Sequence, residues 1–130
     1  MKINRPVGYG LLAMGYMAQN KDEKIIMSQT IAKKNNTPPE YLQMIMQQLV
    51  RANILKSKRG PHGGYSLARP ASKITMLEII EAIDGPINVS LGMDENTPRT
   101  KFVIKTEKAH DKVTAQTRAA YKKIKLSDLI

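Results

Sequence analysis

The segment that most limits how this chain can fold is residues 56–65, KSKRGPHGGY. Its centre cannot be helical, because Pro61 has no backbone N–H and glycines adopt backbone angles that other residues avoid. The flanking segments, residues 54–57 and 65–68, alternate apolar and polar side chains, which is typical of half-buried strands. The segment therefore predicts a β-hairpin with a glycine-rich tip and cationic arms.

The charge of the chain indicates a phosphate-rich partner, either nucleic acid or an anionic membrane. The 130 residues carry a net charge of +10, which is distributed as +8 over residues 1–70, −4 over residues 71–95 and +6 over residues 96–130. A chain of this length is typical of one domain with one core. We find no long apolar run and no basic-then-apolar leader, so we expect a cytoplasmic protein that does not enter a membrane.

The residues before the hairpin predict three helices. A first helix is expected over residues 6–19, with Tyr9, Leu12, Ala13, Tyr16 and Met17 on its apolar face. Small residues in this helix favour close approach by another helix. Residues 25–27 are either a strand or the lead into a second, short helix over residues 29–34, with Ser28 as its cap.

The clearest helix start in the chain is Thr37-Pro38-Pro39-Glu40. Thr37 and Glu40 have the spacing of a capping box, and proline suits the first helical position. This third helix is expected to end near Ala52. Its predicted buried face is Leu42, Ile45, Met46 and Leu49, and its outward residues are Gln43, Gln47, Gln48 and Arg51, with Met44 at the boundary.

A short helix, a polar turn and a longer helix with exposed amides is the helix-turn-helix pattern, and the hairpin makes it a winged version. We expect the longer helix to lie in the major groove of double-stranded DNA, which is wide enough for a helix. Glutamine can pair with adenine through two hydrogen bonds there. Arg51 and the cations of the hairpin are expected to bind phosphates.

The C-terminal half predicts two further helices. Thr75 and Glu78 have capping-box spacing at the start of a helix through Asp84, which Gly85 ends. Residues 87–100 have the composition of a loop. A long, highly charged helix over residues 101–123 has only a thin apolar stripe, which a second copy of the chain is expected to cover. The stripe is Phe102, Thr106, Ala109, Val113, Gln116 and Ala120.

These residues resemble a known family, the Rrf2-type bacterial winged helix-turn-helix regulators (the IscR, NsrR and CymR family). The run Ile54–Ala68, with its Arg-Gly-Pro-x-Gly-Gly-Tyr hairpin, is the most specific marker. The segments Ala82–Pro86 and Leu126–Ile130 also match. The resemblance covers nearly the whole chain, although residues 87–123 match only loosely.

The resemblance implies a homodimeric repressor or activator that binds a pseudo-palindromic operator. The fold class expected is mainly α with a small β-hairpin. Residues 1–86 would form the winged domain, 87–100 a loop and candidate effector region, and 101–130 the dimerisation helix and tail. Residues early in the third helix would read bases, and the wing would enter the minor groove. The predicted DNA contacts are Gln29, Thr37, Glu40, Tyr41, Gln43, Met44, Gln47, Arg51, Lys56, Lys58, Arg59, His62 and Gly63.

One departure from the resembled family concerns the region of residues 87–110, where many members place three cysteines that hold an iron–sulfur cluster. This chain has no cysteine, and His110 alone cannot replace three thiolates. We therefore expect no cofactor. The signal would be a small-molecule effector in this region, a partner protein, or none.

Two other function classes remain open at this point. The first is a winged-helix protein- or RNA-interaction module without a specific operator. The second, an enzyme, is disfavoured because no Ser–His–acid set and no metal-ligand spacing is recognisable. His62 is either a phosphate contact or an exposed turn residue.

Overall fold

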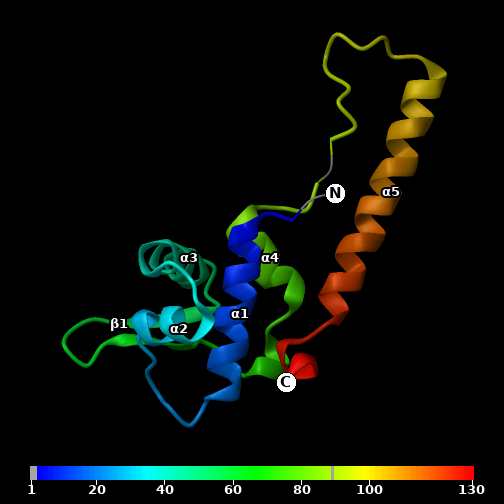
Figure 1. Ribbon diagram of the computed structural model, residues 1–130. Helices are drawn as coiled ribbons and strands as arrows, with labels where there is room; N and C mark the ends of the chain where they lie inside the picture. Colours follow the sequence, from blue (N-terminus) through cyan, green and yellow to red (C-terminus); the bar gives the residue numbers. More distant parts are fainter. Residues whose placement is uncertain (1–2, 89) are drawn as a thin grey trace.

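The computed structural model describes residues 3–88 and 90–130, which form a mainly helical chain with a two-stranded antiparallel hairpin (Figure 1). The predicted fold class, a winged helix-turn-helix domain followed by a long C-terminal helix, is confirmed. In chain order the elements are α1 (Arg5–Gln19), α2 (Ser28–Asn35), α3 (Pro39–Arg51), β1 (Leu55–Lys58), β2 (Gly64–Leu67), the 3-10 turn η1 (Ala71–Lys73), α4 (Met76–Asp84), α5 (Lys101–Lys123) and the 3-10 turn η2 (Leu126–Leu129).

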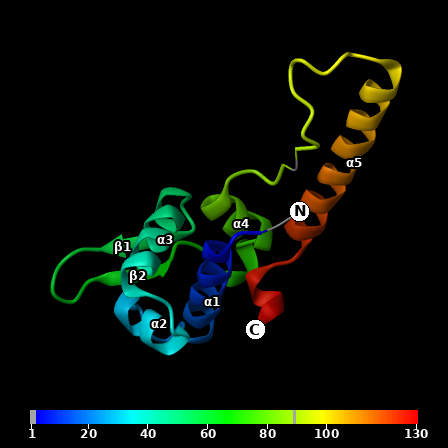
Figure 2. The ribbon, with the colours of Figure 1, turned by 45° about the horizontal axis from the view of Figure 1, so that its top comes forward.

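Helix α1 lies at the centre of the winged domain, between α4 on one side and α2, α3 and the hairpin on the other (Figures 1 and 2). The predicted apolar face was wrong at Leu12, which is 52% exposed. Helix α4 approaches α1 closely at Gly10, where the Ile83 side chain occupies the space that a Cβ would need. The buried residues of α1 are Val7, Gly10, Ala13, Met14, Met17 and Ala18.

The helix-turn-helix is formed by α2 and α3, and it contradicts both predicted caps. Helix α2 begins at Ser28 rather than after it. Helix α3 has Pro38 at its N-cap position and no side-chain cap, so Thr37 and Glu40 do not form a capping box. The two prolines explain this, because a residue that precedes proline is driven into an extended conformation. Pro38, with ψ of 124°, therefore cannot begin the helix, and α3 starts at Pro39.

The hairpin projects from the domain as a wing. Leu55 pairs with Leu67 at its base and Lys58 with Gly64 near its tip. The buried residues of the two strands are Leu55, at the base, and Tyr65, which pairs with Ser57, and the rest of β1 is exposed. The bridge between Ile26 and Tyr65 fixes the residues before α2 to the wing, with both N–H···O distances at 2.8 Å.

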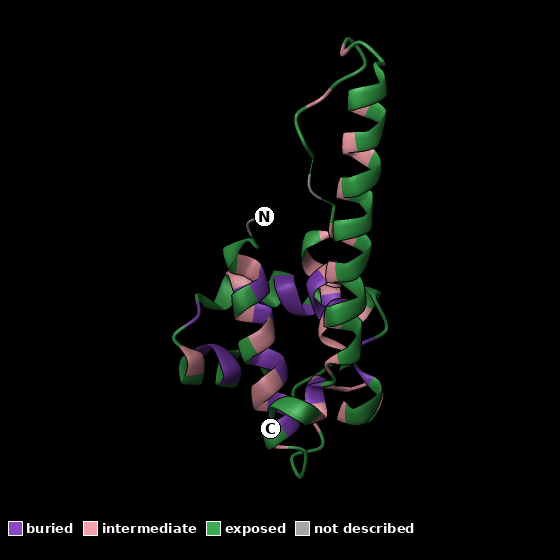
Figure 3. Ribbon diagram, turned by 90° about the vertical axis from the view of Figure 1, so that its right-hand side faces the viewer, coloured by how far each residue is buried: buried purple, intermediate pink, exposed green. Residues whose placement is uncertain are grey.

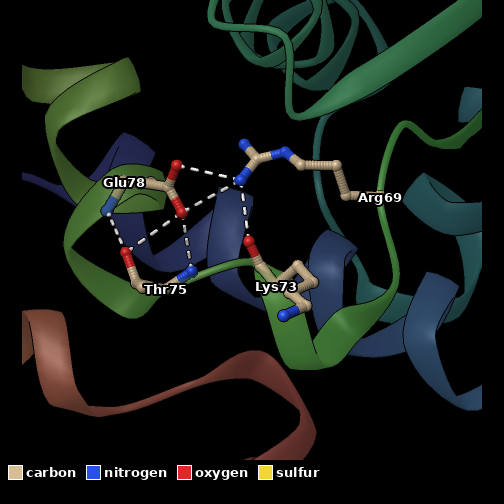
Figure 4. A network of polar contacts seen from close by, with 4 residues as sticks. All are labelled: Arg69, Lys73, Thr75 and Glu78. Carbon is tan, nitrogen blue, oxygen red and sulfur yellow. Dashed lines mark hydrogen bonds and ion pairs between the residues drawn. The ribbon is translucent and has the colours of Figure 1, made fainter.

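Helix α4 begins with the predicted capping box, which Figure 4 shows as part of a larger network. The Thr75 backbone N–H donates to Glu78 Oε2 at 2.8 Å, and the Glu78 N–H donates to Thr75 Oγ1 at 3.1 Å. Arg69 Nη1 donates to Glu78 Oε1 at 3.1 Å and to the Lys73 carbonyl at 2.7 Å. Partial burial works to raise the pKa of Glu78, but the hydrogen bonds from Thr75 and Arg69 outweigh it and the pKa is lowered.

Helix α5 stands away from the winged domain and has no buried residue among those described (Figure 3). Its C-terminal part lies beside α4, and the chain then returns to the domain. The Leu126 N–H donates to the Ile74 carbonyl, and the Met76 N–H donates to the Ile124 carbonyl, each at 2.8 Å. Leu126 is only 2% exposed and belongs to the core of the winged domain.

Candidate nucleic-acid interface

A groove of about 600 Å³ lies between α3, the start of α2 and the wing. Helix α3 supplies one wall through Pro39, Glu40, Gln43 and Gln47. The start of α2 contributes Met27, Ser28 and Gln29, and the wing contributes Ser57, Lys58, Arg59, Gly60, Gly63, Gly64 and Tyr65.

The sequence of α3 directs its polar face into this groove. Leu42, Ile45, Met46 and Leu49 are fully buried against the core. Because residues three and four positions apart share a helix face, that burial leaves Glu40, Gln43 and Gln47 together on the outer side. The predicted buried face of this helix is confirmed.

The geometry of the wing depends on its glycines. Gly60 has φ of +107° at the tip, a conformation that residues with a Cβ rarely adopt. Gly64 has φ of +156°, and a Cβ there would lie 2.6 Å from the Ile26 carbonyl oxygen. Gly63 closes the tip by donating its N–H to the Gly60 carbonyl at 2.9 Å. The wing can therefore approach the start of α2, which completes the groove.

The structure separates the predicted contact residues into three groups. Those that line the groove are Gln29, Glu40, Gln43, Gln47, Lys58, Arg59 and Gly63. Those that are exposed but do not line it are Met44, Arg51, Lys56 and His62. The remaining two, Thr37 and Tyr41, point toward the protein.

The side chains of Thr37 and Tyr41 pack against the protein. Thr37 is only 4% exposed, and its hydroxyl has no hydrogen-bond partner within the described residues. Tyr41 is half-buried and meets Tyr9 edge to face, with ring centroids 5.7 Å apart at 90°. The Thr37 side chain cannot reach a nucleic acid in this conformation.

Two serines that line the groove were missed by the sequence analysis, Ser28 and Ser57. Ser28 was interpreted as a helix cap. Ser57 stands between the cations of β1, and its exposure could have been inferred from the glycine-rich tip that holds the strand away from the core.

A second, smaller hollow of about 180 Å³ lies between the 87–100 loop and α5. Asn88, Leu91, Met93, Glu107, His110 and Asp111 line it. Arg99 holds the end of the loop to α5 through a two-pronged ion pair with Glu107, at 2.8 and 2.9 Å. This pairing lowers the pKa of Glu107. The hollow lies in the predicted effector region.

Comparison with known proteins assigns the family. The Rrf2 sequence profile, described as an iron-dependent transcriptional regulator, matches residues 3–130. The chain belongs to the Rrf2 family. The CymR transcriptional regulator of Bacillus subtilis is 33% identical over 118 residues, covering 90% of this chain and 86% of CymR. IscR of Cereibacter sphaeroides is 27% identical over 135 residues, covering 100% of this chain and 87% of IscR.

Solved structures of Rrf2 regulators have the same fold. That of CymR, the global cysteine regulator of B. subtilis, matches with a TM-score of 0.79 at 29% identity and covers 99% of this chain and 95% of CymR. That of T. potens IscR matches with a TM-score of 0.75 at 26% identity and covers 99% of this chain and 85% of IscR. This Rrf2 protein is a DNA-binding transcriptional regulator, and its relatives are regulators rather than enzymes.

The iron in the family description does not fit the residues of this member. The chain contains no cysteine. Within residues 3–88 and 90–130, no group of three or more His, Asp or Glu side chains is placed to hold a metal ion.

The same part of the chain contains no helix long and apolar enough to cross a membrane.

Proposed function

We propose that this Rrf2 protein is a homodimeric repressor that binds a pseudo-palindromic operator in the cytoplasm. In this proposal α3 enters the major groove, the wing reaches the neighbouring minor groove, and one sugar–phosphate strand occupies the groove between them. The observation that carries the proposal is the groove itself, which has amides on one wall and cations on the other.

The two walls suit different parts of DNA. Gln43 and Gln47 project from α3, where an amide can pair with the N6 and N7 of adenine. Lys58 and Arg59 face them from the wing and supply the positive charge that a phosphate strand requires. Exposed Arg51, Lys56 and His62 extend the contact surface beyond the groove.

The dimer part of the proposal rests on α5. Phe102 is 75% exposed and Val113 is 56% exposed on a helix with no buried residue. A second copy of α5 would cover these side chains. We assign residues 1–86 to DNA binding, 87–100 to a loop that receives a small-molecule effector or a partner protein, and 101–130 to dimerisation and the tail.

Selection of bound sequences from random duplex DNA tests the proposal. We expect a palindromic motif, and affinity that falls steeply with salt because each neutralised phosphate releases counterions. A Gln43→Ala variant should lose the adenine preference at one position of each half-site, whereas Gln19→Ala, an exposed amide on α1, should keep the motif unchanged. Recovery of no enriched sequence would support an RNA- or protein-interaction module instead.

A further inference from the structure

Among the described residues that line the groove, Glu40 is the acidic one, and it lies in the first turn of α3, where its charge suits the helix N-terminus but leaves the carboxylate oxygens open to a ligand. Its side chain is exposed. Within residues 3–88 and 90–130, no hydrogen bond or ion pair engages it: the ion pairs found there join Arg69 to Glu78, Arg99 to Glu107 and Arg118 to Glu81.

The contrast with Glu78 shows that Glu40 does not cap its helix. Both glutamates stand three residues after a threonine, in the spacing of a capping box. Glu78 holds the start of α4, but α3 has no side-chain cap and Thr37 is turned into the core. The capping-box role that the sequence offers for Glu40 is therefore absent, and its carboxylate oxygens remain available to a ligand of the groove.

An ionised carboxylate accepts hydrogen bonds and cannot donate them. In the major groove guanine presents only acceptors, N7 and O6, and thymine presents the O4 acceptor and a methyl group. Adenine presents a donor beside an acceptor, whereas cytosine presents its N4 amino group alone. A glutamate on the reading face therefore favours cytosine and is repelled by guanine and thymine.

We propose that Glu40 is a specificity-determining residue that selects a cytosine in each half-site of the operator, an inference that rests on the proposed function. It stands on the same face of α3 as Gln43, one turn earlier, so its cytosine lies near the adenine read by Gln43. Its negative charge also opposes the phosphates that Lys58 and Arg59 attract. Glu40 thus weakens binding to all DNA and recovers affinity only where a cytosine is offered.

The test compares wild-type protein with Glu40→Gln, which keeps the shape and removes the charge. Glu95→Gln, an exposed residue outside the groove, is the matched control because it changes the net charge equally. Each protein is used for selection from random duplex DNA. Affinities are then measured for the wild-type motif and for variants in which the selected cytosine pair is replaced.

We expect wild-type protein to lose on the order of tenfold in affinity when that cytosine is replaced in one half-site. Glu40→Gln should lose this preference, keep the rest of the motif and bind unrelated DNA more tightly, and Glu95→Gln should behave as wild type. A Glu40→Gln motif identical to the wild-type one, with all affinities raised alike, would overturn the reading role and leave only charge repulsion. A wild-type motif without cytosine near the Gln43 adenine would also overturn it. No motif for any protein would instead refute the proposed function.

Discussion

Replacing Leu126 by alanine tests whether the C-terminal turn belongs to the core of the winged domain. Leu126 is 2% exposed and lies in the same cluster as residues from α1 to α4. Truncation of a fully buried leucine removes its burial energy and leaves a cavity, which together cost about 3 kcal/mol. For a chain of this size that corresponds to a fall of about 10 °C in Tm.

Leu129→Ala is the matched control, because Leu129 lies in the same turn but is 54% exposed. It should change the free energy of unfolding by less than about 0.5 kcal/mol. Both variants are unfolded in urea at one protein concentration, since the stability of a dimer depends on concentration. We expect Leu126→Ala to lower the urea midpoint by about 1.5 M with an unchanged slope. A difference between the two variants below about 1 kcal/mol would refute the packing argument.

Three further predictions follow from charges and backbone geometry. Lys58→Ala should weaken binding to all sequences and reduce the slope of log affinity against log salt concentration by about one, whereas Lys105→Ala on α5 should do neither. Equal slopes for Lys58→Ala and wild-type protein would remove Lys58 from the phosphate contacts. The Arg118 hydrogen bonds hold the pKa of Glu81 below its usual 4.5, so its ionised form contributes stability above about pH 4.5 that is lost as the pH falls through the folded pKa. As the pH is lowered, the urea midpoint of Glu81→Gln should therefore fall less steeply than that of the wild-type protein. Parallel plots of midpoint against pH for the two proteins would contradict this. Gly64→Ala should distort the wing and destabilise by about 1–3 kcal/mol, whereas Gly8→Ala, in open space on α1, should stabilise slightly; melting curves of equal Tm would contradict the close approach at Gly64.

The sequence predicted the hairpin and the buried face of α3 because both depend on local patterns. Gly60 and Pro61 exclude a helix whatever surrounds them. The spacing of Leu42, Ile45, Met46 and Leu49 describes one helix face, and the structure buries that face. These local patterns therefore predict two walls of the groove, α3 and the wing, without knowledge of any tertiary contact.

Features that depend on tertiary contacts or on neighbouring prolines were not predicted. The threonine–glutamate spacing occurs at the start of both α3 and α4 and forms a capping box only in α4. The difference was readable in Pro38-Pro39, since the first proline must be extended. The orientation of α1 was not readable, because it depends on the contact between Gly10 and Ile83, which are far apart in the sequence.

The attachment of α5 to the winged domain bears on how a dimer would read DNA. Arg118 of α5 donates to both oxygens of Glu81 in α4, at 3.0 and 2.8 Å, and Glu81 Oε2 also accepts the Ile87 N–H at 2.8 Å. One carboxylate thus joins α5, α4 and the start of the loop, and Leu126, just after the end of α5, anchors the chain in the core. Since this end of α5 is held to the winged domain, pairing of two α5 helices in the proposed homodimer would set the distance between the two wings. In the proposed homodimer, a displacement of Ile87 would therefore change the distance between the two wings through Glu81, without contact to the groove.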